Sequence, residues 1–493
     1  MGRQALVSAP SARRPFATLP SVFCLGCSAW FCFNCTPYVQ YVSVCSVVSN
    51  PFCVVSRLLY VYVVLVSATP LIAPSPLVPN HEEVFRTHNL YLTKKDGHLL
   101  VQSGECQILL VESMPENLTY SADSPKHAST FFAWNVLLDH VSERLSIASF
   151  YWSLLAESKF NMSAVEYGHK IYDALLARAK TININIAQSG PKKSDEELDR
   201  MTAAGAHVHW VDVAKLLGAG VLHTKLWIAD RKHAYLGSAN MDWRSLTEVK
   251  ELGALILNCP LIVEDLNKIH DAYCLAETGI PSKWPAELTT IYNRKNPMQL
   301  TVNGIRSRVY ISGSPREFNA PGRTFDLDAI LSTIARATQF VYISVMDYSP
   351  EIVNYTNFAD GRYWPAIDDA LRRAAVDRNV EVRLLVSRWP YTSPTMAKYL
   401  SSLKALNGIR RSRIRIRYFE VPVFTIEQQR IPHARVNHNK YMVTDETAYI
   451  GTSNWSGDYF LYTGGAALVI QDELEDDPIN LDTNLKTLRA QLS

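Results

Sequence analysis

The chain lacks a strong charge of either sign. Its 49 Lys and Arg residues are balanced by 47 Asp and Glu residues, which leaves a formal net charge of +2 over 493 residues. A protein without a basic excess cannot attract nucleic acid through its overall field, so any affinity for a polyanion must come from a local groove. The apolar fraction of 47% suffices for one large core or two similar domains. Composition therefore indicates a globular protein and excludes a polycation.

Charged residues are nearly absent from the amino-terminal region, where Arg57 is the only one between Pro15 and Asn80. The uncharged stretch 58–79 is long enough to cross a bilayer, which needs about 20 residues. The arginines upstream of it favour a cytosolic amino terminus and a lumenal catalytic region. We therefore expect a single-pass type II membrane anchor within residues 1–80. Segment 16–56 is also uncharged, so two spans, with the rest of the chain in the cytosol, are the alternative.

Cysteine is scarce outside that region. Six of the nine cysteines lie between positions 24 and 53, and only Cys106, Cys259 and Cys274 follow. Two C-x2-C pairs in the early group resemble a zinc pattern, but only four residues separate them, so we expect acylation or packing in lipid. We predict no metal site.

One pattern of polar residues occurs twice in the remaining sequence. Each copy reads H-x-K-x4-D followed by G-[ST]-x-N, and the gap between the two parts is one residue shorter in the second copy. The residues are His223, Lys225, Asp230 and Asn240 in the first copy, and His438, Lys440, Asp445 and Asn454 in the second. Because two complete copies are improbable by chance, the repetition predicts one active site built from two half-sites.

The residue types of this pattern suit the hydrolysis of a phosphodiester. The two ammonium groups and the two Asn amides can bind the non-bridging oxygens and stabilise the charge of the transition state. One His can attack phosphorus, while the other protonates the leaving oxygen and then activates water. Each Asp suits a hydrogen bond to the second ring nitrogen of its His, with a structural salt bridge as the alternative. Because His and Lys at i and i+2 of a strand point to the same side, we expect both to face one phosphate.

The sequence around the motifs is also duplicated. The apolar strand 145–152 aligns with 341–348, and each is followed by a helix, a strand, a second helix, a strand and the motif strand. Strands that alternate with helices predict an α/β fold. We expect a first half at 81–275 and a second half at 325–493, which face each other across one central active site. Segment 276–324 contains several Pro and Gly residues, which indicate a connection.

The two motifs resemble the HKD motifs of the phospholipase D superfamily. Further segments are similar to its endolysosomal type II membrane branch, which contains phospholipase D family members 3 and 4; these segments are 147–154, 237–247, 363–373 and 434–444. The resemblance implies a duplicated phospholipase D-like α/β/α sandwich. It also implies an acid-active exonuclease, independent of metals and cofactors, that trims single-stranded DNA and RNA from the 5′ end. In the superfamily the amino-terminal motif often supplies the nucleophile, which favours His223.

The same resemblance implies a lumenal setting, reached from the endoplasmic reticulum and Golgi to the endosome and lysosome, and allows a homodimer. Cys106 and Cys259 match positions that are disulfide-bonded in this branch, so we expect a bond between them, with two buried thiols as the alternative. The sequons at Asn117, Asn161 and Asn354 agree with glycosylation in a lumen.

Two rival functions remain open from the sequence. One is a phospholipase D or transphosphatidylase that acts on lysosomal phospholipids with the same catalytic set. The other is a catalytically silent binding protein, although all eight motif positions are intact. Segment 410–417 alternates basic and apolar residues and could line a nucleic-acid path or form a solvated face. Tyr151 and Trp152 in the first half, and Met346 and Tyr348 in the second, end strands that we expect to approach the cleft. The aromatic residues among them could stack bases or belong to the core.

Overall fold

The computed structural model describes residues 92–95, 98–101, 104–121, 124–157, 159–160, 162–352, 361–472 and 487–493. The predicted anchor at 58–79, Asn161 and Asn354 lie outside these ranges. Among the helices that are described, none is both long and apolar enough to cross a membrane.

The first half is built on an eight-stranded sheet with the order β4-β3-β12-β10-β9-β5-β7-β8. Its strands are β3 (Gln107–Ser113), β4 (Ala128–Ser129), β5 (Arg144–Ser149), β7 (Asn183–Ser189), β8 (His207–Val211), β9 (Leu226–Ala229), β10 (His233–Gly237) and β12 (Glu251–Leu257). The helices of this half are α2 (Thr130–His140), α3 (Val165–Ala179), α4 (Glu196–Ala203), α5 (Val213–Leu217), α6 (Arg244–Thr247) and α7 (Pro260–Ala276). Strands β5, β7 and β8 run parallel, because α3 and α4 provide the crossovers that parallel strands require.

The second half repeats this arrangement with the order β13-β14-β23-β22-β21-β16-β19-β20, and β15 pairs with β14. Its strands are β13 (Met298–Val302), β14 (Ile305–Ser314), β15 (Thr324–Phe325), β16 (Phe340–Val345), β19 (Glu381–Ser387), β20 (Arg413–Phe419), β21 (Lys440–Thr444), β22 (Ala448–Gly451) and β23 (Gly465–Asp472). Its helices are α8 (Asp326–Arg336), α9 (Ala366–Arg378), α10 (Pro394–Lys404), α11 (Ile426–Arg430), α12 (Gly457–Leu461) and α14 (Leu488–Leu492). Seven strands correspond one to one between the halves, which confirms the predicted duplicated α/β architecture.

Short elements complete the described chain. They are the hairpin β1 (Leu92–Lys95) and β2 (His98–Val101), the pair β6 (Trp152–Ser153) and β11 (Met241–Asp242), the pair β17 (Glu351–Ile352) and β18 (Arg362–Tyr363), and 3₁₀ turns at Ala286–Leu288, Arg316–Phe318 and Ile409–Arg411.

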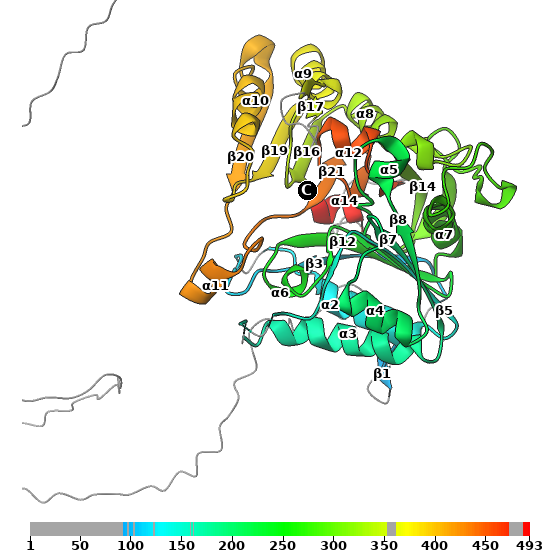
Figure 1. The fold of residues 1–493 in the computed structure, drawn as a ribbon. Helices are drawn as coiled ribbons and strands as arrows, with labels where there is room; N and C mark the ends of the chain where they lie inside the picture. The colour runs from blue at the N-terminus through cyan, green and yellow to red at the C-terminus, as the bar shows by residue number, and fades with distance from the viewer. Residues whose placement is uncertain are drawn as a thin grey trace, which may run out of the picture. The chain divides into compact units, whose positions relative to one another are not determined.

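Three apolar clusters define the layers of the fold. One packs α2, α3 and α4 against one face of the first sheet, and another packs α8, α9 and α10 against one face of the second; Figure 1 shows these two groups of helices. The third cluster contains α7 and residues of both sheets, among them Ile256 of β12 and Ile450 of β22. Because both faces of each sheet are covered, strands such as β9 are buried at every position.

Segment 276–324, predicted as a connection, differs from that expectation. Strands β13 and β14 lie within it and belong to the second sheet, so this sheet starts at Met298 rather than after residue 324. Asn303 and Gly304 join the two strands with positive φ values of 54° and 79°. Asn-Gly is the usual pair for a two-residue hairpin with both residues in that region, so this glycine marks a turn within a sheet and not a linker.

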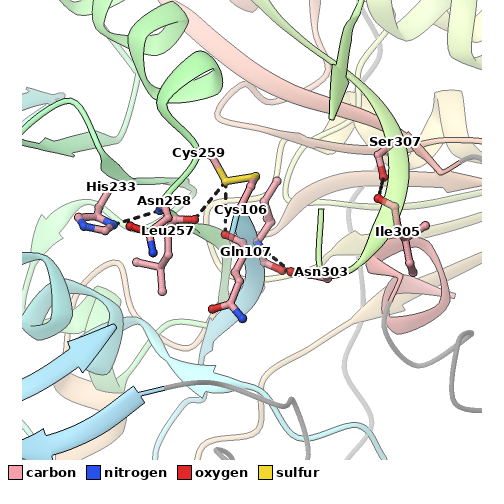
Figure 2. The surroundings of a disulfide bond; sticks show 10 residues. Cys106, Gln107, His233, Leu257, Asn258, Cys259, Asn303, Ile305 and Ser307 are labelled. Atoms are coloured by element: carbon pink, nitrogen blue, oxygen red, sulfur yellow. Dashed lines mark hydrogen bonds between the residues drawn. A yellow bond between two sulfur atoms is a disulfide. The ribbon is translucent and has the colours of Figure 1, made fainter. Parts of the chain in front are cut away.

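A disulfide joins Cys106, which precedes β3, to Cys259, which precedes α7, with their Cα atoms 4.6 Å apart (Figure 2). The side chain of Asn303 lies beside it, where its Nδ2 donates to Ile108 O at 2.8 Å and its Oδ1 accepts from Ile108 N at 2.9 Å. The hairpin turn of the second sheet is therefore bonded to the beginning of β3 in the first.

We expect Cys106→Ser to lower the free energy of unfolding by about 2–5 kcal/mol, because the bond closes a long loop in the unfolded chain. The sequence separation of its ends is 153 residues. Urea unfolding of the oxidised protein measures this change. Cys274→Ser is the matched control, since Cys274 is a free thiol, and an equal loss in both variants would contradict a role for the bond.

Candidate active site

The two motif histidines lie together. The ring centroids of His223 and His438 are 6.5 Å apart, and the ring planes meet at 67°. Both rings line one cavity of about 420 Å³. Other side chains on its wall are Phe150, Tyr151, Asn240, Asp242, Arg244, Glu251, Met346, Asp347, Trp389, His433, Asn454 and Tyr459. The predicted half-sites therefore form a single site.

Main-chain hydrogen bonds dock each histidine onto the other half of the molecule. His223 N donates to Gly464 O at 2.8 Å, and His438 N donates to Lys250 O at 2.7 Å. Each acceptor is the residue immediately before β23 or β12. The histidines precede β9 and β21 and do not lie within them, which differs from the strand position that we expected.

The second ring nitrogens of the two histidines have different partners. His438 Nδ1 lies 2.8 Å from Glu251 Oε2, the carboxylate of the first residue of β12. His223 Nδ1 lies 2.9 Å from the carbonyl oxygen of Thr452. Gly465, the first residue of β23, stands where Glu251 stands in the first half. A Cβ at Gly465 would lie 2.2 Å from Ser453 Oγ, so the second half has no room there for a side chain.

Glu251 is a site residue that the sequence analysis missed. Its buried carboxylate also accepts from Ser238 Oγ at 2.5 Å and from Ser245 Oγ at 2.8 Å. Burial opposes its charge, but the neighbouring His438 and these donors hold the pKa of Glu251 below its ordinary value. The available signal was a carboxylate at the start of an otherwise apolar, fully buried strand.

The two motif aspartates do not hold the imidazoles, and this prediction was wrong. Asp230 accepts from Ser142 N, Glu143 N, Arg144 N and Ser142 Oγ at 2.7–2.9 Å. Asp445 likewise accepts from the main chain at Thr338, Gln339 and Phe340. Each Asp follows its motif strand, at the end away from the histidine, and ties it to the start of β5 or β16. Their role is structural, and it is made with main-chain donors rather than with the salt bridge that we had considered.

The motif lysines are buried behind the cavity wall. Lys225 Nζ donates to His223 O at 2.6 Å, and Lys440 Nζ donates to His438 O at 2.8 Å. Burial and mutual repulsion lower the pKa of Lys225 well below its ordinary value, and burial lowers that of Lys440. Each lysine therefore reinforces the position of its histidine, and an anionic ligand in the cavity would favour the ammonium form of both.

The motif asparagines lie on the cavity wall. The Oδ1 atoms of Asn240 and Asn454 are buried and have no hydrogen-bond partner among the described residues. Asn454 Nδ2 donates to Asp347 Oδ2 at 3.2 Å and to the Tyr459 hydroxyl at 3.1 Å. Burial raises the pKa of Asp347, although the nearby Lys440 opposes the shift. An Asp on this wall was not anticipated from the sequence.

Burial, the two lysines and the other ring lower the pKa of His223 well below its ordinary value. Burial also lowers the pKa of His438, but Glu251 opposes that shift. Without substrate the site thus favours neutral His223 more strongly than neutral His438. A bound phosphate anion would favour the imidazolium forms.

The other residues considered in the sequence analysis divide into two groups. Tyr151 and Met346 line the cavity, whereas Trp152 and Tyr348 are buried in the apolar clusters. The arginines of β20 are exposed on the edge of the second sheet, outside the cavity wall. Asn117 is exposed.

The chain matches a family described as "PLD3/4, PLD-like domain" over residues 121–423. Three curated relatives illustrate the similarity. The "5'-3' exonuclease PLD3" of Xenopus laevis is 46% identical over 74% of this chain and 75% of its own length. The Homo sapiens protein of that name is 44% identical over 74% and 75%. The "5'-3' exonuclease PLD4" of Mus musculus is 43% identical over 76% and 74%.

We expect Asp230→Asn and Asp445→Asn to lower the free energy of unfolding by about 1–3 kcal/mol each, since an amide group would face main-chain donors. The turnover number of the folded protein should stay within about twofold of wild type. Urea unfolding and active-site-normalised rates measure the two effects. A large loss of turnover at unchanged stability would place these carboxylates in the chemistry.

We expect Asp347→Asn to retain more activity than wild type as the pH rises. Above its pKa the Asp347 carboxylate is anionic and opposes binding of a phosphate, whereas the amide is neutral at every pH. A repulsion of about 1 kcal/mol corresponds to roughly a fivefold difference in kcat/KM near neutrality. The pH profiles of kcat/KM for the two proteins provide the test, and superimposable profiles would contradict it.

Proposed function

The chain belongs to the PLD3/4, PLD-like family, and we propose from this and from its site that it is a 5′-to-3′ exonuclease on single-stranded DNA or RNA. The chemistry is phosphodiester hydrolysis through a phosphohistidine. The observation that supports it most strongly is the pair of rings that line one cavity, 6.5 Å apart. The relatives that bear the exonuclease name support the choice of nucleic acid.

The partners of Nδ1 support a division of the two roles. The Thr452 carbonyl can only accept, so it fixes His223 with the proton on Nδ1 and a free lone pair on Nε2. Neutral His223 is therefore the nucleophile. Glu251 stabilises the imidazolium form of His438, as a general acid requires. This assignment agrees with the one favoured by the sequence.

In the first step, His223 Nε2 attacks phosphorus, the bond to the leaving oxygen breaks, and His438 Nε2 gives its proton to that oxygen. In the second step, neutral His438 takes a proton from water, whose oxygen attacks phosphorus and breaks the P–N bond. This transfer restores the imidazolium form of His438, and breaking the P–N bond regenerates neutral His223. Asn240 and Asn454 lie on the cavity wall, where each amide would have to turn its Nδ2 towards the cavity to donate to a non-bridging oxygen. The lysines stabilise the developing charge.

We further propose a lumenal, acidic setting. A disulfide is typical of an oxidising compartment, and the sequon residue Asn117 is exposed. Low pH favours the protonated form of the general acid His438. Attachment to the membrane through residues 1–80 and passage to the endosome and lysosome belong to the same proposal.

The test uses purified protein, chelator, acidic buffer and a 3′-labelled single-stranded oligonucleotide, with phosphatidylglycerol as the parallel substrate. We expect stepwise loss of 5′ nucleotides. His223→Ala and His438→Ala should each lower the rate by about a thousandfold or more, because nucleophilic and general acid catalysis would be lost. Degradation that requires an added divalent metal, or a variant that keeps the wild-type rate, would contradict the mechanism.

A substrate with a p-nitrophenolate leaving group separates the two roles, since that group leaves without a proton. His438→Ala should still release a burst of p-nitrophenol and accumulate phosphohistidine, whereas His223→Ala should show neither. Acid-labile label on the protein after quenching measures the intermediate. The reverse pattern would exchange the two assignments.

A further inference from the structure

A second cavity of about 570 Å³ adjoins the catalytic one, and the two share Trp389 and His433 on their walls. It is formed by residues 388–391, which follow β19, and by residues 420–435, which lead from β20 towards His438. The motif chemistry uses none of the side chains that are unique to this cavity. A ligand that extends beyond the scissile phosphate could therefore continue into it.

Aromatic rings provide a platform in this cavity. Tyr391 is 57% exposed and stacks on His433 with ring centroids 4.5 Å apart and planes at 25°. The ring of Trp389 lies 4.8 Å from that of Tyr391 at 62°. One face of the Tyr391 ring is occupied by His433, so its high exposure leaves surface for a further planar group. Stacking of this kind tolerates any base.

Hydrogen-bond donors accompany the platform. Trp389 Nε1 and Gln428 Nε2 are buried and have no partner among the residues that the structure describes. Gln428 Oε1 accepts from Phe424 N at 2.9 Å, which fixes the orientation of the amide. Buried donors are nearly always paired in folded proteins, so two such groups on one wall point to an acceptor-rich ligand. Arg430 adds positive charge to the wall, whereas Arg388 is paired with Glu420 of the same wall.

The wall is held rigidly. Arg435 is buried and donates to the carbonyl oxygens of Pro422 and Glu116 and to the carboxylate of Glu248. Both His433 and Arg435 adopt positive φ values near 55°, a conformation that surrounding contacts must maintain. This segment is thus anchored to the first half and keeps the platform in place before any ligand arrives.

We propose that this second cavity binds the nucleotide next to the scissile phosphate, with its base against Tyr391 and its acceptor atoms at Gln428 and Trp389. The inference rests on the proposed nuclease function. It specifies how the enzyme would distinguish a nucleic-acid chain from a phospholipid or from a substrate with a single nucleoside. A phospholipid headgroup has phosphate acceptors but no flat ring, so the platform favours a nucleic acid. Substrates with a single nucleoside would leave the cavity empty.

Two variants test the subsite. Tyr391→Ala removes the ring, and Gln428→Glu keeps the acceptor for Phe424 N while replacing the buried donor by an anion. Each is compared with wild type on a thymidine p-nitrophenyl phosphodiester and on a short oligothymidylate, with chelator present. We expect the ratio of oligonucleotide to ester kcat/KM to fall by about five- to a hundredfold, the range measured when stacked aromatics are truncated.

Tyr363→Ala is the matched control. Tyr363 is also an exposed tyrosine, 64% exposed, that stacks on another ring, Tyr399, and it lies outside both cavities. In this variant the ratio of oligonucleotide to ester kcat/KM should equal that of wild type. Thermal unfolding curves of all three variants show whether each is folded at the temperature of the assay.

The outcomes distinguish the subsite from the function itself. If wild type cleaves the oligonucleotide and both variants keep its ratio, the subsite is excluded while the nuclease proposal stands. If wild type cleaves neither nucleotide substrate but hydrolyses phosphatidylglycerol, the nuclease proposal fails and the nucleotide subsite fails with it. A reduced ratio in both cavity variants, with the control unchanged, supports the subsite.

Discussion

The site depends on a reciprocal main-chain contact between the two halves. The amide of each motif histidine is bonded to a carbonyl oxygen of the other half, at Gly464 for His223 and at Lys250 for His438. Neither half can orient its own imidazole alone, because the acceptor for the ring nitrogen also comes from the partner half. The shared apolar cluster between the sheets stabilises this pairing. The packing of the two sheets against each other therefore also determines the geometry of the site.

Duplication supplies two similar half-sites, but hydrolysis through a covalent intermediate requires two different histidines. The difference arises at one pair of equivalent positions, where β12 begins with Glu251 and β23 begins with Gly465. A carboxylate beside His438 favours a proton on both of its nitrogens, whereas a carbonyl beside His223 favours the neutral ring. A Cβ at Gly465 would clash with Ser453 Oγ unless that hydroxyl moved, which disfavours a second carboxylate there. This difference between the repeats gives the two imidazoles different hydrogen-bond partners, which is the basis of the roles proposed for them.

The family resemblance implied the pairing of Cys106 with Cys259, which the structure contains. The sequence itself predicted the duplicated fold and the meeting of His223 with His438. It could do so because repeated motifs and alternating elements are local patterns. Contacts that form between the halves could not be anticipated in this way. Asp230 and Asp445 were expected at the imidazoles because they are near in sequence, yet a strand of four residues in the first motif and five in the second separates each from its histidine. Glu251 belongs to no local motif and reaches His438 only after the sheets pack.

The buried basic groups around the cavity favour the binding of a phosphate. Lys225, Lys440 and the two imidazoles are concentrated in a desolvated space, and burial and mutual repulsion lower the pKa of Lys225. Glu251 compensates only part of this charge, and Asp347 tends to be neutral because burial raises its pKa. An anionic phosphodiester would replace repulsion by attraction for several groups at once. That gain increases as negative charge accumulates on the oxygens, so the arrangement favours the transition state over the bound substrate.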